Sequence, residues 1–250
     1  MRFGLLGPVE VWSGSRSLAR HARPQQRTLL AALLDDLGRL ATPDELIGRI
    51  WGESPPPTAR RTLHSHISRI RNLLTQEADA GAPRLLFRDG CYLLLAPAEA
   101  VDAQVFRRLV QEAGQQEAHE RVRLLRDALS LWRGEALSGL PGPWAERRRE
   151  MYRRQRVRAI LDWADSLRDL GQANRSLEAL ERTVESEPLT EPVTARLVAA
   201  LYTEGYASDA LRSYHAFSRQ LADELGTVPG PTLRRLHTAI VQGRPLPELG

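Results

Sequence analysis

The chain has 250 residues, a formal net charge of +4 and a single cysteine, Cys91. One cysteine excludes an intramolecular disulfide and a cysteine-based zinc site. All 35 basic residues are arginine, which excludes a P-loop lysine, a Schiff-base lysine and a serine and lysine catalytic pair. No apolar run approaches about 18 residues and the N-terminal segment lacks a signal-peptide pattern, so we expect a soluble cytoplasmic protein without membrane contact.

The excess positive charge lies in the first part of the chain. Residues 1–96 carry 13 arginines and 9 acidic residues, whereas residues 97–250 carry 22 of each. An anionic partner is therefore expected to bind the first part. The pattern also changes near Pro97, from mixed short elements to helices only. The sequence thus predicts two domains, over residues 1–96 and 97–250.

The first domain is predicted to begin with a small sheet and a helix. Two short strands are expected over residues 3–12, interrupted at Gly7, with a third near Leu18. Pro24 opens a run with a stripe of leucines at helical spacing, and Gly38 should close that helix.

The next two helices are indicated by their ends and their spacing. The run from Thr42 to Glu45 has the pattern of a reciprocal capping box, and Gly52 should end the helix that follows. After three prolines, residues 58–74 contain four arginines and no acidic residue. The apolar residues of this stretch recur at helical spacing and should enter a core: Leu63, Ile67, Ile70 and Leu74.

The opposite face of this third helix is cationic and rich in short polar side chains. Arginines can contact phosphates or guanine edges in a major groove, and short polar side chains let the helix backbone come close. A solvated amphipathic helix is the plainer alternative, because a run of charge usually means no more. With one arginine from the following hairpin, the residues predicted to face DNA are Arg60, Arg61, His64, Ser65, His66, Ser68, Arg69, Arg71, Asn72 and Arg88.

Residues 84–95 predict a β-hairpin after the cationic helix. Two apolar runs flank Asp89 and Gly90, a dipeptide that favours a two-residue turn between antiparallel strands. The order of sheet, three helices and hairpin indicates a helix-turn-helix variant with a wing, in which the third helix enters the major groove.

The second domain is predicted to be helical throughout. Apolar residues at helical spacing, from Phe106 to Val110 and from Val122 to Trp132, indicate a first helical pair. A later set of four residues is matched by a second set 34 residues further on: Leu167, Gly171, Leu177 and Leu180, then Leu201, Gly205, Leu211 and Tyr214. This period, with glycine at the turn, is typical of tetratricopeptide-like helix pairs, which usually present a surface to another protein.

Residues 146–158 form a second basic stretch, with seven arginines and two glutamates. The stretch has two interpretations. It is either a further contact for nucleic acid or protein, or the solvated face of a long helix whose other side is buried. The balanced charge of the rest of this domain favours the structural interpretation.

No pattern in the sequence predicts catalysis, a metal site or a cofactor. The motifs G-x-S-x-G, H-E-x-x-H and C-x-x-C and a glycine-rich dinucleotide loop are all missing. His64 and His66 lie two positions apart, so on a helix they point in nearly opposite directions and cannot grip one ion. We therefore expect a protein that is not an enzyme.

Several motifs resemble those of the Streptomyces antibiotic regulatory proteins. The most specific are WGESPPPTAR, SRIRNLL and LADELGTVPGPTLRRLH, and the resemblance covers nearly the whole chain. It implies an α+β OmpR-like winged helix-turn-helix domain followed by an all-α bacterial transcriptional activation domain. It also implies an activator of antibiotic gene clusters that binds direct repeats in double-stranded DNA beside a second copy of itself and contacts RNA polymerase.

Carried over by position, the DNA-facing residues of the family fall on the third helix and near the wing: Arg61, His64, Ser65, Ser68, Arg69 and Arg88. One departure is Cys91, because the family generally has glycine before the tyrosine. A rival interpretation is an adaptor whose winged helix binds protein. The arginines present in residues 58–74 favour the DNA-binding interpretation over the adaptor interpretation.

Overall fold

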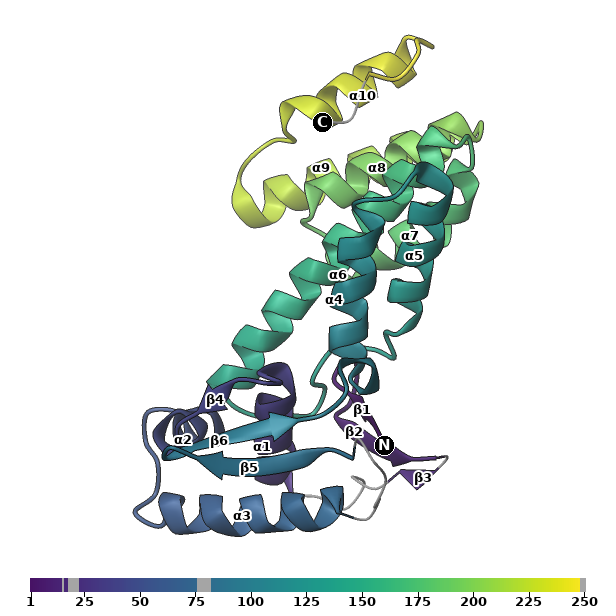
Figure 1. The fold of residues 1–250 in the computed structure, drawn as a ribbon. Helices are drawn as coiled ribbons and strands as arrows, with labels where there is room; N and C mark the ends of the chain where they lie inside the picture. The colour runs from purple at the N-terminus through teal and green to yellow at the C-terminus, as the bar shows by residue number, and fades with distance from the viewer. Residues whose placement is uncertain (15, 18–22, 76–81, 248–250) are drawn as a thin grey trace. The chain divides into compact units, whose positions relative to one another are not determined.

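A computed structural model of the chain describes residues 1–14, 16–17, 23–75 and 82–247. The chain forms two compact units (Figure 1), made of residues 1–109 with 128–155 and of residues 110–127 with 156–250. The three helices α4, α5 and α6 each begin in one unit and end in the other. The functional division at residue 96 stays a prediction.

The first unit begins with an antiparallel sheet in the order β1-β2-β3: Arg2–Gly4, Glu10–Ser13 and Arg16–Ser17. The first two strands agree with the prediction. The third strand ends next to Leu18, which lies outside the described residues.

Three helices follow the sheet: α1 (Pro24–Asp35), α2 (Pro43–Trp51) and α3 (Ala59–Leu74). The predicted capping box is present, because the Glu45 amide donates to Thr42 Oγ1 at 3.2 Å and the Thr42 amide donates to the Glu45 carboxylate at 2.7 Å. Gly38 was predicted to close α1, but the helix already ends at Asp35. The Gly38 amide instead donates to the carbonyl of Leu94 at 3.1 Å and so joins the wing.

The wing is a three-stranded sheet in the order β4-β6-β5: Leu40–Ala41, Cys91–Leu95 and Arg84–Arg88. Asp89 and Gly90 form the predicted turn with φ of +50° and +76°, the left-handed values that a type I′ turn requires. Arg88 pairs with Cys91 across the turn, so the cysteine leaves the hairpin intact. The strand β4 was not predicted, because two residues carry no periodic pattern.

Leucine-rich faces of the helices and the wing form the core of this unit. The predicted apolar stripe of α3 is buried: Leu63, Ile67, Ile70 and Leu74. The leucines of α1 and the inward residues of the wing are buried as well: Leu29, Leu30, Leu33, Leu34, Leu85, Tyr92 and Leu94. Since one face of α3 lies in this core, its opposite face lies at the surface.

A buried carboxylate joins α1 to two later helices, α4 (Asp102–Ala113) and α6 (Pro143–Asp169). The Asp35 side chain is only 2% exposed. It accepts hydrogen bonds from Tyr152 Oη at 2.6 Å, from Arg107 at 2.8 Å and from Arg148 at 2.8 Å. Burial, reinforced by Asp35, raises the pKa of Tyr152, so its hydroxyl stays protonated and donates. We infer that α1 depends on all three partners, because an unpaired buried charge is strongly destabilising.

The N-terminal sheet is fixed to the same later part of the chain. The amides of Leu5 and Leu6 donate to the Asp102 carboxylate at 2.7 and 3.1 Å. Arg133 pairs with that carboxylate at 3.1 Å, and its guanidinium lies 4.8 Å from the ring centre of Trp12. A Cβ at Gly4 would overlap the Arg133 guanidinium, so a larger residue there would displace that side chain from this position.

The described part of the second unit is helical, as predicted. A short 3₁₀ turn, η1 (Ala98–Ala100), precedes α4 in the first unit, and a second, η2 (Ala173–Ser176), follows α6. The remaining helices are α5 (Ala118–Ser130), α7 (Leu177–Ser186), α8 (Glu191–Thr203), α9 (Ala207–Leu225) and α10 (Pro231–Val241).

The 34-residue repeat has a structural counterpart at the ends of α6 and α8. The Gln172 amide donates to the carbonyl of Leu167 at 2.8 Å, and 34 residues later the Tyr206 amide donates to the carbonyl of Leu201 at 2.8 Å. A glycine with positive φ, 68° or 86°, closes each helix: Gly171 and Gly205. The pairs α6 with α7 and α8 with α9 therefore repeat one helical hairpin, a tetratricopeptide-like arrangement.

The basic stretch at residues 146–158 belongs to α6, and several of its arginines bind other parts of the chain. Arg148 contacts Asp35, and Arg149 donates to two loop carbonyl groups at 3.3 and 2.9 Å. Arg153 and Arg154 both pair with Glu150. These contacts support the structural interpretation.

Tyr152→Phe should lower the free energy of unfolding by about 1.5 to 3 kcal/mol, because it removes a hydrogen bond to a buried charge. Tyr214→Phe is the matched control, since the structure shows no hydrogen bond from the Tyr214 hydroxyl to a described residue, and it should cost less than about 0.5 kcal/mol. Urea unfolding of both variants measures the difference. Equal losses would show that the Tyr152 hydroxyl does not stabilise Asp35.

Candidate nucleic-acid interface

One face of α3 presents seven of the residues predicted to face DNA, and all seven are exposed: Arg60, Arg61, His64, Ser65, Ser68, Arg69 and Asn72. Arg88 is exposed beside the turn of the wing. The side chains of Arg61, Arg69 and Arg88 form no hydrogen bond or ion pair with the described residues. The helix therefore carries unneutralised guanidinium groups on the face opposite its buried stripe.

His66 does not lie on this face, so its predicted place there is wrong. Its side chain is 3% exposed, and Nε2 lies 3.4 Å from the side-chain oxygen of Gln25 on α1. The ring's Nδ1 is buried without a hydrogen-bond partner among the described residues. Position 66 borders both faces of the helical wheel, and the packing of α1 decides which face it joins.

Arg71, also predicted to face DNA, bonds to the wing, and its DNA contact stays a prediction. Its side chain is partly buried, and Nε donates to the carbonyl of Leu85 on β5 at 2.9 Å. This bond joins α3 to β5 of the wing.

The first turn of α3 is electrostatically open to an anion. Arg60 and Arg61 stand near the positive end of the helix dipole, and this turn has no acidic residue. Arg60 pairs with Asp44 on α2 at 2.6 Å, but both side chains are mostly exposed, 62% and 78%. A phosphate could therefore replace or join this carboxylate at little cost.

A hydrogen bond between the wing and α3 was missed by the sequence reasoning. Tyr92 Oη lies 3.0 Å from His64 Nδ1, and the Tyr92 ring centre lies 4.9 Å from that of Phe87, a residue 55% exposed. Counting outward from the two-residue turn places Phe87 opposite Tyr92, which the register confirms. The sequence could therefore have predicted that Phe87 and Tyr92 pair, although it does not show which residue of α3 the pair contacts.

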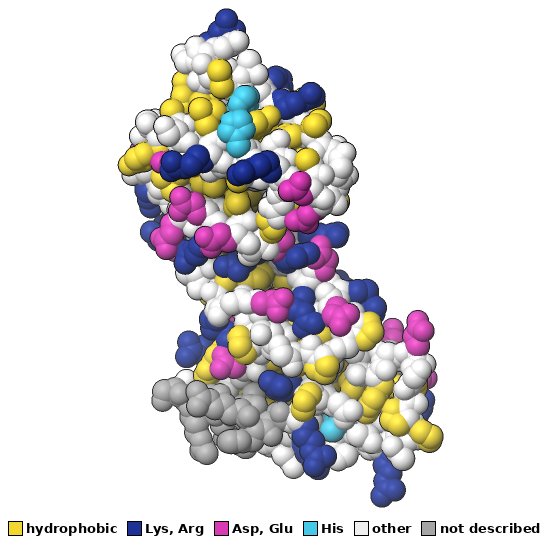
Figure 2. Space-filling model, turned by 180° about the vertical axis from the view of Figure 1, so that it is seen from behind, with side chains coloured by type: hydrophobic (Ala, Val, Ile, Leu, Met, Phe, Trp, Pro, Cys, Tyr) yellow, Lys and Arg dark blue, Asp and Glu magenta, His cyan; other side chains and the backbone are white. Residues whose placement is uncertain are grey.

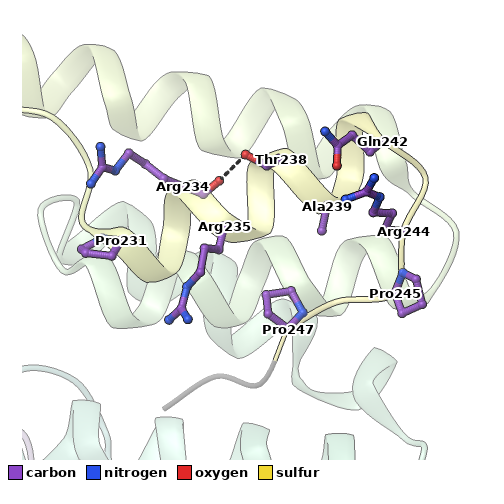
Figure 3. A pocket seen from close by; sticks show the side chains of 9 residues that line it. All are labelled: Pro231, Arg234, Arg235, Thr238, Ala239, Gln242, Arg244, Pro245 and Pro247. Atoms are coloured by element: carbon purple, nitrogen blue, oxygen red, sulfur yellow. Dashed lines mark hydrogen bonds between the residues drawn. The ribbon is translucent and has the colours of Figure 1, made fainter.

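A second candidate surface lies on α10 in the helical unit. An open pocket of about 610 Å³ is lined by Pro231, Arg234, Arg235, Thr238, Ala239, Gln242, Arg244, Pro245 and Pro247. Figure 3 shows that residues 244–247 run back along α10, with Pro247 on the same side of the helix as Arg235. Figure 2 shows arginine and hydrophobic side chains over this end of the unit, with carboxylates gathered lower on the same face. The pocket thus suits an anionic partner.

The described residues were also compared with the requirements of a metal site and of a membrane span. They contain no group of three or more histidine, cysteine, aspartate or glutamate side chains placed to hold a metal ion. None of the described helices has the length and apolar character needed to cross a membrane.

Two family models match the chain. The model described as bacterial transcriptional activator domain matches residues 101–241, and the model described as transcriptional regulatory protein, C terminal, matches residues 19–86. The chain is 38% identical to the regulatory protein AfsR of Streptomyces coelicolor, over 98% of this chain and 24% of AfsR. It is 31% identical to the transcriptional regulator RedD of the same organism, over 98% of this chain and 72% of RedD.

The fold is also similar to a solved structure of Mycobacterium tuberculosis EmbR in complex with a low affinity phosphopeptide. The TM-score is 0.86 at 31% identity, over 98% of this chain and 66% of that chain. The chain therefore spans about a quarter of the length of AfsR and about two thirds of the EmbR chain.

His66 should make the stability of the first unit depend on pH. Burial, then the nearby Arg69 and Arg23, lower its pKa below the usual value. The unfolded chain thus binds the proton more readily than the folded chain, so stability falls as pH decreases below about 6.5 toward the folded pKa. We expect His66→Leu to reduce the drop in Tm between pH 7.5 and pH 5.5. His119→Leu, which changes an exposed histidine, should keep the full drop, and the same reduction in both variants would rule out His66 as the cause.

Proposed function

The chain belongs to the Streptomyces antibiotic regulatory protein family of transcriptional activators, and we propose that it acts by placing α3 in the major groove of operator DNA. Both matched domains are regulatory types rather than enzymatic ones. The observation that carries the proposal is the exposed face of α3, where Arg61 and Arg69 have no partner among the described residues. Free guanidinium groups beside Ser65 and Ser68 suit both phosphate and base contacts.

The contacts divide by position along the interface. Arg60, close to the first turn, is assigned to phosphate, because the helix dipole already favours an anion there. Arg69 lies in the middle of the exposed face and is assigned to a base edge, where a guanidinium pairs best with guanine. Arg88, at the turn of the wing, is assigned to the adjacent minor groove or its phosphates.

The family membership also supports an operator and a cellular role. We propose that the operator consists of direct repeats bound by two copies of the chain. The regulated genes are proposed to form a secondary-metabolite gene cluster, in keeping with the family membership and the similarity to AfsR and RedD of Streptomyces coelicolor. This role places the protein in the cytoplasm with the chromosome.

The helical part is proposed to recruit RNA polymerase. In this division of labour, residues 1–96 bind DNA and residues 97–250 activate. The matched activator domain over residues 101–241 and the tetratricopeptide-like helix pairs support it. We assign the polymerase contact to the α10 pocket, because three arginines and no carboxylate line it, which suits an acidic segment of a partner protein.

Arg69→Ala and Arg60→Ala should weaken DNA binding in different ways. Loss of a base contact at Arg69 should cost roughly 1 to 3 kcal/mol on the operator and little on random DNA. Loss of a phosphate contact at Arg60 should weaken binding to both and reduce the slope of log K against log salt by about 1. Titrations of footprinted operator and random duplex at several salt concentrations separate the two. If the DNA affinity of the unmodified chain does not depend on salt concentration, the protein-docking adaptor is favoured instead.

The pocket on α10 should matter for activation and not for DNA binding. Replacing Arg234, Arg235 and Arg244 by alanine removes three charge contacts of about 0.5 kcal/mol each, so polymerase affinity should fall roughly tenfold. In vitro transcription with purified polymerase at matched operator occupancy measures the loss. The control replaces three exposed arginines of the same unit outside the pocket: Arg175, Arg182 and Arg212. If both triple variants activate equally, the pocket is not the polymerase contact.

A further inference from the structure

Tyr92 of the wing contacts the exposed face of α3 through a hydrogen bond with His64. Tyr92 is 2% exposed, whereas His64 is exposed on the proposed groove-facing surface. Tyr92 Oη and His64 Nδ1 are 3.0 Å apart, and the two rings meet edge to face with centres 6.4 Å apart. One ring nitrogen of His64 is thus occupied from within the protein, and the other, Nε2, is left for a ligand.

We propose that Tyr92 sets the tautomer of His64, so that α3 presents an Nε2–H donor that reads a hydrogen-bond acceptor on a base edge. This inference rests on the proposed function, because it concerns how the DNA interface selects sequence. Tyr92 is then a positioning residue and His64 is the specificity-determining residue that touches DNA.

The direction of the hydrogen bond follows from what each group can do in the described structure. A neutral histidine has one ring N–H, so Nδ1 either accepts from Tyr92 or donates to it. If Nδ1 donated, the O–H of Tyr92 would need another acceptor, and the structure shows none among the described residues. A buried donor without an acceptor is costly. Burial also raises the pKa of Tyr92, which keeps the hydroxyl protonated. Tyr92 therefore donates to Nδ1, and the ring proton of His64 lies on Nε2.

The contacts around this pair hold Tyr92 and the wing against α3. The Phe87 ring, directly across the hairpin, lies 4.9 Å from Tyr92. The bond from Arg71 Nε to the Leu85 carbonyl, 2.9 Å, ties β5 to the same helix. Ser68 Oγ donates to the backbone carbonyl of His64 at 3.1 Å and so does not compete for the ring nitrogens. The orientation of His64 is thus set before DNA arrives.

A fixed Nε2–H donor has a defined preference in the major groove. Guanine offers N7 and O6 as acceptors, adenine offers N7 and thymine offers O4, whereas cytosine offers only an amino donor. An Nε2–H group on His64 can therefore donate to guanine, adenine or thymine at its position, but not to cytosine. A histidine free to change tautomer would accept from the cytosine amino group through an unprotonated Nε2 and would lose this preference.

The tautomer can be read directly in the free protein. Long-range ¹H–¹⁵N correlation spectra distinguish a protonated Nε2 from a protonated Nδ1, without any DNA present. We expect the His64 signals of the unmodified chain to show protonated Nε2, and those of Tyr92→Phe to show averaging between the two tautomers. Circular dichroism at the same temperature checks that the variant is folded.

Base specificity is measured as the affinity for operator duplexes in which each position carries each of the four bases in turn. The unmodified chain should show one position where cytosine alone weakens binding, by about 5- to 50-fold. In Tyr92→Phe that penalty should shrink to about twofold, with the other positions unchanged. His64→Gln keeps a donor near the place of Nε2 but has no tautomer to set. Adding Tyr92→Phe to His64→Gln should therefore change nothing further.

The outcomes separate this inference from the proposed function. Protonated Nδ1 in the free chain, or a Tyr92→Phe loss spread evenly over all operator positions, overturns the tautomer mechanism and leaves operator binding standing. A further loss from Tyr92→Phe in the His64→Gln background also overturns it, since Tyr92 would then act by another route. An unmodified chain that binds no DNA overturns the proposed function and the reading of bases by His64 together.

Discussion

A carboxylate can remain charged in an apolar core only if neighbouring groups balance it, and this requirement determines which segments of the first unit must come together. Asp35 ends α1, but its partners stand far along the chain, 72 residues away at Arg107 and 117 residues away at Tyr152. The packing of α1 in turn buries His66 and one face of α3. The placement of the proposed DNA-facing surface therefore depends on residues that never approach that surface.

The wing acts on the same helix from the other side. The wing contacts α3 through Arg71 and through Tyr92. The helix is therefore held by α1 on one side and by the wing on the other. A helix held in this way loses little backbone freedom when it meets a rigid partner such as duplex DNA. The winged helix is thus suited to recognition by preformed geometry, with Arg61 and Arg69 left free to complete the contacts.

Much of this architecture could be predicted from local sequence. The capping box at Thr42, the turn at Asp89 and the apolar stripe of α3 are each specified by a few adjacent residues, and all three are present. The failures concern long-range packing. His66 sits at the border of two helix faces, and only α1 decides its burial. Likewise no local pattern shows that β4 pairs with β6, or that Tyr92 meets His64.

The position of Arg148 and Tyr152 has a consequence for bacterial genetics. Both lie within residues 101–241, the segment that matches the activator domain, yet both bind the last residue of α1 in the winged-helix unit. A screen for positive-control mutants seeks substitutions that abolish activation while promoter occupancy persists. We expect alleles at these two positions to fail that criterion, because they remove contacts that hold α1, the helix packed against α3. From their position in the sequence they would be classified as activation mutants. Their expected phenotype is instead that of substitutions in the winged helix.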